Sequence, residues 1–198
     1  MVRLSSPVAI FTLLAAFAVG AHCDTITYSE SAIVSGSIGN TNITNALVTL
    51  TATGSSSTVV ESLPGVFINV LPTELTIAGI GSTMFTDTIQ FVSNTTNDLA
   101  GVGDRTLNLA VLFTQNSAFG SYNLQTGIGA TTGSPAFNFG VKFGTELGLF
   151  SIESSGSSTF QAIDTSTPTV PEPSAFTLLG TGILGIASVV RRKLLSHS

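Results

Sequence analysis

Apolar and polar residues alternate with a period of two along several stretches between residues 24 and 164. In ALVTLTAT (46–53), Val48 and Leu50 oppose Leu47 and Thr49. The same alternation recurs in MFTDTIQFV (84–92), TLNLAVLF (106–113) and AFNFGVKF (136–143). Side chains of a β-strand point alternately to its two faces, so this pattern predicts half-buried strands.

Further strand candidates are short apolar runs rich in β-branched and aromatic residues, separated by clusters of Gly, Ser, Asn and Pro. They are TITYSES (25–31), VFINV (66–70), LTIAGI (75–80), LGLFSI (147–152) and STFQAI (158–163). Turns are expected at GSSS (54–57), LPG (63–65), NTTND (94–98), TTGSP (131–135) and SSGSS (154–158). We see no ten-residue amphipathic helix, so the pattern predicts an all-β fold, an antiparallel β-sandwich of about 8–10 short strands.

The N-terminus has the layout of a secretory signal peptide. Arg3 is followed by an apolar stretch from Val8 to Val19 and then by small residues. Cleavage could follow Ala21 or Cys23, and Cys23 is favoured because DTITY then begins the first strand. We therefore expect a signal peptide over residues 1–23.

The C-terminus combines three different segments. Residues 165–173 form a Pro-rich linker that ends in Val170, Pro171, Glu172 and Pro173. Residues 174–190 carry no formal charge and are just long enough for a transmembrane helix. Arg191, Arg192 and Lys193 open a basic tail (191–198) that is expected to stop transfer and to stay cytoplasmic.

Charge separates the ends of the chain from its middle. All eleven acidic residues lie between Asp24 and Glu172, where Arg105 and Lys142 are the only basic residues, so this part carries a formal charge of −9. Such a charge excludes the electrostatic footprint of a nucleic-acid-binding protein. The 24–164 body also contains no Cys, His or Trp.

The missing residue types restrict the chemistry of the body. A Ser/His/Asp triad, a Cys nucleophile and a thiolate or imidazole metal site are excluded there, and we expect no cofactor, no metal and no enzyme activity. Paired carboxylates of a glycoside hydrolase remain a distant alternative. The candidate residues are Glu61, Glu74, Asp87, Asp98, Asp104 and Glu146.

Two binding alternatives also remain open. A calcium site through oxygen ligands is conceivable at Asn94, Asn97, Asp98 and Asp104. A carbohydrate-binding, lectin-like module would need exposed aromatic side chains. Because the Phe residues mostly fall on inferred core faces, Tyr28 and Tyr122 are the candidates for sugar contact.

The order Val170-Pro171-Glu172-Pro173, apolar segment and Arg191-Arg192-Lys193 resembles the tripartite PEP-CTERM sorting signal. That signal occurs in exported proteins of Gram-negative bacteria that make exopolysaccharide. The resemblance covers Val170 to His197 and implies recognition by exosortase, a membrane-embedded cysteine transpeptidase-like enzyme. It would cut near Pro-Glu-Pro and discard the helix and the basic tail.

These expectations combine into one route for the protein. The secretion machinery and signal peptidase would export it, and the C-terminal helix would hold it transiently in the inner membrane with its body outside. An exosortase-like enzyme would then process it for the cell surface or the extracellular matrix. The body would have a structural or interaction role, with extracellular polysaccharide as a candidate partner.

Overall fold

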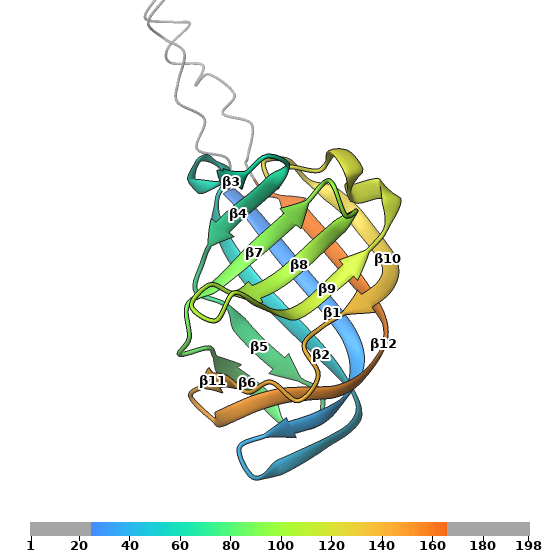
Figure 1. Cartoon of the computed structure of the whole chain (residues 1–198). Coiled ribbons are helices and arrows are strands. Elements are labelled where there is room, and N and C mark those ends of the chain that lie inside the picture. The colour runs from blue at the N-terminus through green and yellow to red at the C-terminus, as the bar shows by residue number, and fades with distance from the viewer. Residues whose placement is uncertain (1–24, 166–198) are drawn as a thin grey trace, which may run out of the picture. The chain divides into compact units, whose positions relative to one another are not determined.

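The computed structural model describes residues 25–165, which fold into twelve β-strands and two short 3-10 helices (Figure 1). The predicted all-β antiparallel class is therefore confirmed. The first six strands are β1 (Thr25–Ile38), β2 (Thr41–Ser55), β3 (Val60–Leu63), β4 (Val66–Val70), β5 (Glu74–Ile77) and β6 (Gly81–Met84). The remaining elements are β7 (Ile89–Asn94), β8 (Leu99–Asp104), β9 (Leu109–Gln115), β10 (Ile128–Ala136), β11 (Phe143–Thr145), β12 (Gly148–Asp164) and the helices η1 (Ser56–Thr58) and η2 (Ser117–Ser121).

All the described strands belong to one curled sheet, in the order β3-β4-β7-β8-β9-β10-β12-β1-β2-β5-β6, with β11 beside β12. The prediction of a sandwich of two separate sheets was wrong in this respect. The reason is β10, whose first part pairs with β12 and whose last residues pair with β9, so the ladder continues between the two halves. The prediction of about 8–10 short strands was also wrong, because residues 25–165 contain twelve strands, of which β1, β2 and β12 have 14, 15 and 17 residues.

The curl brings aromatic rings from distant strands into one core. Tyr28 of β1 stacks on Phe91 of β7 with ring centroids 5.1 Å apart, and Phe91 also lies near Phe160 of β12. Phe119 of η2 meets Phe160 edge-on at 5.6 Å. Such aromatic contacts add to the apolar area that the core buries, so they hold the two halves of the sheet face to face.

The predicted alternation is confirmed most clearly in β2, and β1, predicted only as a strand, alternates as well. Val48, Leu50 and Ala52 are buried, whereas Leu47 points outward and is 46% exposed. In β1 every second residue from Ile26 to Val34 is buried. Because β1 lies between β12 and β2, its inward side chains form the centre of the core.

Two predicted turns, 131–135 and 154–158, are instead interior parts of β10 and β12. A Cβ on Gly133 would lie 2.0 Å from the carbonyl oxygen of Gln115. This glycine therefore permits a close approach of two backbones rather than a turn. The 154–158 stretch contains a bulge, where Ala32 and Val34 oppose Ser158 and Ser155.

The predicted strand at 136–143 was also wrong, because a loop joins β10 to β11. Gly140 has a positive φ of 66°, which breaks an extended conformation, and Phe139 is 75% exposed. By contrast, the turns at 63–65 and 94–98 are confirmed. Gly65 has a φ of 76°, as the first of these turns requires.

The predicted termini lie outside the described residues, including the signal peptide (1–23), the transmembrane helix (174–190) and the basic tail (191–198). Within residues 25–165, no helix is long and apolar enough to cross a membrane.

Candidate functional site

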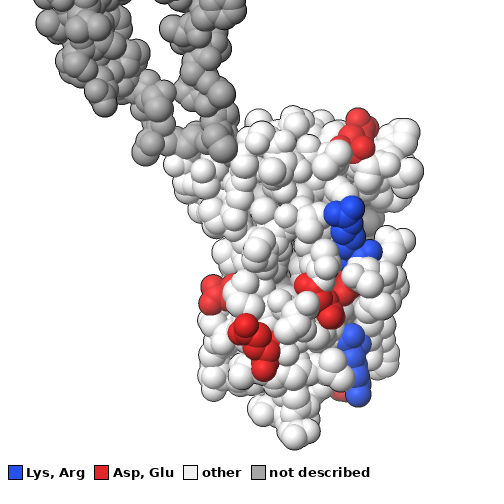
Figure 2. Space-filling view, turned by 90° about the vertical axis from the view of Figure 1, so that its left-hand side faces the viewer, with Lys and Arg blue, Asp and Glu red and all other residues white. Residues whose placement is uncertain are grey.

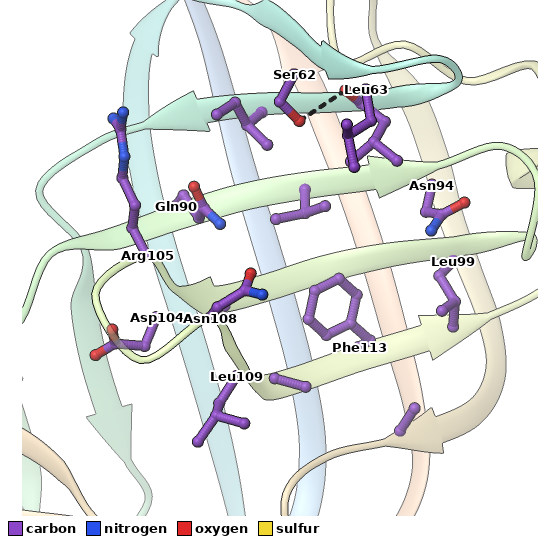
Figure 3. A pocket seen from close by; sticks show the side chains of 16 residues that line it. Ser62, Leu63, Gln90, Asn94, Leu99, Asp104, Arg105, Asn108, Leu109 and Phe113 are labelled. Atoms are coloured by element: carbon purple, nitrogen blue, oxygen red, sulfur yellow. Dashed lines mark hydrogen bonds between the residues drawn. The ribbon is translucent and has the colours of Figure 1, made fainter.

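A groove of about 510 Å³ lies on the outer face of the β4-β7-β8-β9 part of the sheet (Figure 3). The edge strand β3 contributes Leu63 at one side, and β10 contributes Ala136 at the other. Ile68, Val92 and Leu109 add apolar surface between them. A cavity of this size lies in the range of small-molecule sites, so we describe it as the binding groove.

Phe113 lies in the floor of the binding groove because β9 contains a bulge. The register shifts between Val102 and Gly103 of β8, so Val111 and Leu112 are both buried. One residue further on, Phe113 points to the outer face, although simple alternation predicted it on the same face as Val111. The bulge thus places an aromatic side chain on the surface side of the sheet.

Two glycines of β8 let the Phe113 ring lie close to the sheet. A Cβ on Gly101 would lie 3.0 Å from Phe113 Cγ, and one on Gly103 would lie 3.6 Å from Phe113 Cζ. The ring therefore spans the space above both glycines, with one face toward the β8 backbone. Its other face is turned toward the binding groove, where it can act as an apolar platform.

Polar side chains surround this platform (Figure 3). Gln90, Arg105 and Asn108 line the groove, and the buried Asp104 lies at its end. Asp104 Oδ1 accepts a hydrogen bond from the Leu107 backbone N–H at 2.7 Å. Gln90 Oε1 and Asp104 Oδ2 are buried without a hydrogen-bond partner. Buried acceptors normally have partners, and of the two residues only Gln90 is partly exposed, so its amide can turn toward a bound donor.

A second polar cluster lies inside the core, around Glu30. The Thr114 hydroxyl oxygen is 2.7 Å from Glu30 Oε1 and 2.7 Å from Ser158 Oγ, while Ser158 donates to the Phe113 carbonyl at 3.1 Å. Three contacts need three hydrogens, and the two hydroxyls supply only two. A protonated Glu30 carboxyl group can supply the third.

Burial agrees with this count of hydrogens. Glu30 is fully buried, and this burial raises its pKa well above the ordinary value, although hydrogen bonds to Thr114 and Ser158 lower it in part. Sequence reasoning missed Glu30, but a signal was present. Glu30 shares the inward face of β1 with Ile26, Tyr28 and Ala32.

The tyrosines proposed for sugar contact are both in the core. Tyr28 is 0% and Tyr122 is 6% exposed, so neither presents a ring to a ligand in this structure. The Tyr28 hydroxyl donates to the Leu124 carbonyl at 2.6 Å, and burial raises the pKa of both tyrosines. The prediction that they would form a sugar-binding surface is wrong.

Several of the residues suggested for catalysis or calcium binding take part in local structure. Glu61 Oε1 accepts from the Gly65 N–H at 2.8 Å, and Asp87 accepts from the Gly144 N–H. Asn94 Oδ1 accepts from two backbone N–H groups of its own turn. Asp98 precedes β8 and Asp104 ends it, so the suggested calcium ligands do not gather in one place. Within residues 25–165, no three His, Cys, Asp or Glu residues cluster as a metal site would require.

The surface of the body has few charges, as Figure 2 shows for one face. Residues 25–165 contain nine acidic and two basic residues, a formal charge of −7. One of the two basic residues, Arg105, lines the binding groove. The groove therefore combines an apolar floor with neutral amides, one cation and one carboxyl group on an otherwise acidic body.

The sorting and cleavage residues predicted from the sequence lie outside the described residues. They are Ala21 and Cys23, Val170 to Pro173, and Arg191, Arg192 and Lys193. The groove residues Phe113 and Gln90 were not predicted as a site, since the pairing of β7 with β8 and of β8 with β9, together with the bulge in β9, brings them together.

Comparison with known protein families identifies the C-terminal region. Residues 169–193 match the PEP-CTERM protein-sorting motif, a span that includes both Val170–Pro173 and Arg191–Lys193. The motif marks an exosortase substrate, and it implies export and sorting to the cell surface. The comparison with curated proteins found no match, and the comparison with solved structures found none either.

Proposed function

We propose that the β-sheet body acts outside the cell as a non-enzymatic structural or interaction module, at the cell surface or in an exopolysaccharide matrix. The PEP-CTERM motif at 169–193 carries this proposal, because it directs the chain to exosortase and thereby to the surface. On this route, residues 1–23 act as a signal peptide. Residues 174–190 hold the protein in the inner membrane until it is processed near Glu172.

The chemistry of the body supports a role without catalysis. Between residues 24 and 172 the chain has no His and no Cys. Its most perturbed carboxyl group, Glu30, is fully buried and out of reach of a substrate. Glu61 and Asp87 hold backbone N–H groups of nearby turns, which accounts for them as structural residues.

A carbohydrate-binding module is the second candidate, and the binding groove favours it. Phe113 supplies an aromatic floor, and Gln90 and Asn108 supply amide groups beside it. Sites for small polar ligands commonly combine an apolar surface with a few convergent polar groups. This version of the hypothesis rests on Phe113, not on the buried tyrosines.

The intact mass of the protein recovered from the cell surface tests the sorting step. The mature protein should lack residues after about Glu172, and a Glu172→Gln variant should accumulate uncut in the membrane fraction. Glu153→Gln, an exposed acid of β12, serves as the matched control and should be processed normally. Surface protein that retains Arg191 to Ser198 would overturn processing and leave a permanent anchor.

The non-enzymatic role has a separate test. The purified full-length chain is incubated with extracellular polysaccharide from the producing cells, and new reducing ends are measured over time. We expect none above a heat-denatured control. Release of reducing ends that is lost on substituting one of the surface carboxylates would show a hydrolase.

A further inference from the structure

We propose that the binding groove is a site for a neutral glycan, whose sugar ring stacks on Phe113 and whose hydroxyl groups donate to Gln90. The inference deepens the second candidate function above. It rests on three observations: the orientation of the Phe113 ring, the unpartnered acceptors and the charge of the groove.

The Phe113 ring is built into the sheet as a platform. Gly101 and Gly103 leave the space that the ring occupies, and any side chain at Gly101 would displace it. A Cβ there would also lie 2.5 Å from Phe113 Cα. The ring is therefore held by backbone geometry with one face available, and such a preorganised apolar face suits the C–H face of a sugar ring.

The polar groups of the groove call for a ligand that donates hydrogen bonds. Gln90 Oε1 and Asp104 Oδ2 are both buried and lack a partner in the protein. Asp104 itself is only 1% exposed, yet it borders the groove. The Gln90 side chain is partly exposed, so a turn of its amide brings the oxygen within reach of a sugar hydroxyl group, and such a hydroxyl can also accept from the amide of Asn108. A purely apolar ligand would leave these acceptors buried and unsatisfied, which is unfavourable.

Charge selects a neutral glycan over an anionic one. The body between residues 25 and 165 has a formal charge of −7, which repels uronic acids and sulfated sugars. The charged residues of the groove lining are one cation, Arg105, and one carboxyl group, Asp104. With one cation and one acid, the groove itself offers no net positive charge to an anionic polymer.

The length of the groove agrees with a polymer segment. Its lining runs from Ser62 of β3 to Ala136 of β10, across the outer face of the strands between them. A chain of sugars could therefore continue past both sides of the bound segment.

The test is titration calorimetry of the full-length protein with short neutral glucan, mannan and galactan oligosaccharides, and with oligogalacturonate as the anionic comparison. Phe113→Ala should weaken neutral-glycan binding about tenfold or more, as the loss of an aromatic contact predicts. Gln90→Leu should also weaken it while keeping the apolar packing. Phe139→Ala removes an exposed Phe outside the groove and should bind like the wild type.

Thermal unfolding of each variant shows whether it is folded. If Phe113→Ala is unfolded, the binding measured with a folded Gln90→Leu variant still tests the groove. Binding that depends on Phe139 and not on Phe113 would overturn the groove as the site. Binding of oligogalacturonate alone, or of no oligosaccharide, would overturn the ligand class. Neither result would affect the mass measurement of processing, so the two proposals can fail separately.

Discussion

The raised pKa of the buried Glu30 predicts how the free energy of unfolding changes with pH, both in direction and in slope. A group whose pKa is higher in the folded than in the unfolded state stabilises the fold fully below its unfolded pKa. That stabilisation is lost as pH rises toward the folded pKa. Burial raises the pKa of Glu30 in this way. Its contribution should therefore be largest in mild acid and should decline above about pH 4.5, the ordinary value for Glu.

The magnitude follows from the uptake of one proton. In the declining range the unfolded chain has released the proton of Glu30 and the folded chain still holds it. The free energy of unfolding should fall by about 1.4 kcal/mol per pH unit from this group alone. The fall ends once the pH exceeds the folded pKa. Glu30→Gln keeps the shape and the donor to Thr114 but cannot ionise, so this contribution should vanish from its profile.

Urea unfolding of the full-length chain between pH 4 and pH 8 measures this effect. The quantity to plot is the difference in unfolding free energy between wild type and Glu30→Gln at each pH, because other titrating groups cancel in it. Glu153→Gln, on the exposed side of β12, is the matched control and should keep the wild-type profile. An infrared carbonyl band of a protonated carboxyl group, present near neutral pH and absent in Glu30→Gln, would give independent support.

Parallel stability profiles for wild type and Glu30→Gln would refute the reasoning. They would mean that Glu30 is ionised in the fold, with the Thr114 hydroxyl donating to it. The Thr114 hydroxyl hydrogen would then not be available for Ser158. The Thr114–Ser158 contact would be a hydrogen bond only if Ser158 turned away from the Phe113 carbonyl and donated to Thr114 instead.

Two further predictions use matched pairs, and thermal or urea unfolding checks both. Gly133→Ala should destabilise the fold by several kcal/mol or prevent folding, because its Cβ would lie 2.0 Å from a backbone carbonyl, whereas Gly129→Ala meets nothing within 4 Å and should be tolerated. Tyr28→Phe should cost about 1–3 kcal/mol, since it leaves a carbonyl acceptor unpaired, while Tyr122→Phe removes a buried hydroxyl without a partner and should be neutral or stabilising. Equal effects within either pair would contradict the local packing described above.

The strands were predictable where a regular period was uninterrupted. In β2 the alternation of Val48 and Leu50 with Leu47 directly reflects which face meets the core. The same rule places Glu30 inward on β1, although its burial was not predicted. Glutamate is seldom buried, because its charge is costly to desolvate. Here the hydroxyl groups of Thr114 from β9 and Ser158 from β12 lie beside the Glu30 carboxyl group and reduce that cost.

The errors occur where the pairing between strands overrides local composition. Gly and Ser clusters at 131–135 and 154–158 are typical of turns, but here Gly133 serves the close approach of β9 and β10. The pairing of Ile26 with Asp164 joins nearly the two ends of the body, and no local pattern reports it. For the same reason, the bulge that turns Phe113 outward could not be predicted from TLNLAVLF.

The sorting motif is a continuous stretch of sequence, whereas the binding groove is formed by residues from several strands. The motif could be identified from the sequence because another protein reads residues 169–193 in their order along the chain. The groove is assembled from β3, β4 and β7 to β10, so only the folded sheet creates it. Changes at Glu172 should therefore alter the location of the protein and leave glycan binding intact. Changes at Phe113 should do the reverse, and a variant that lost both functions together would indicate a global folding defect.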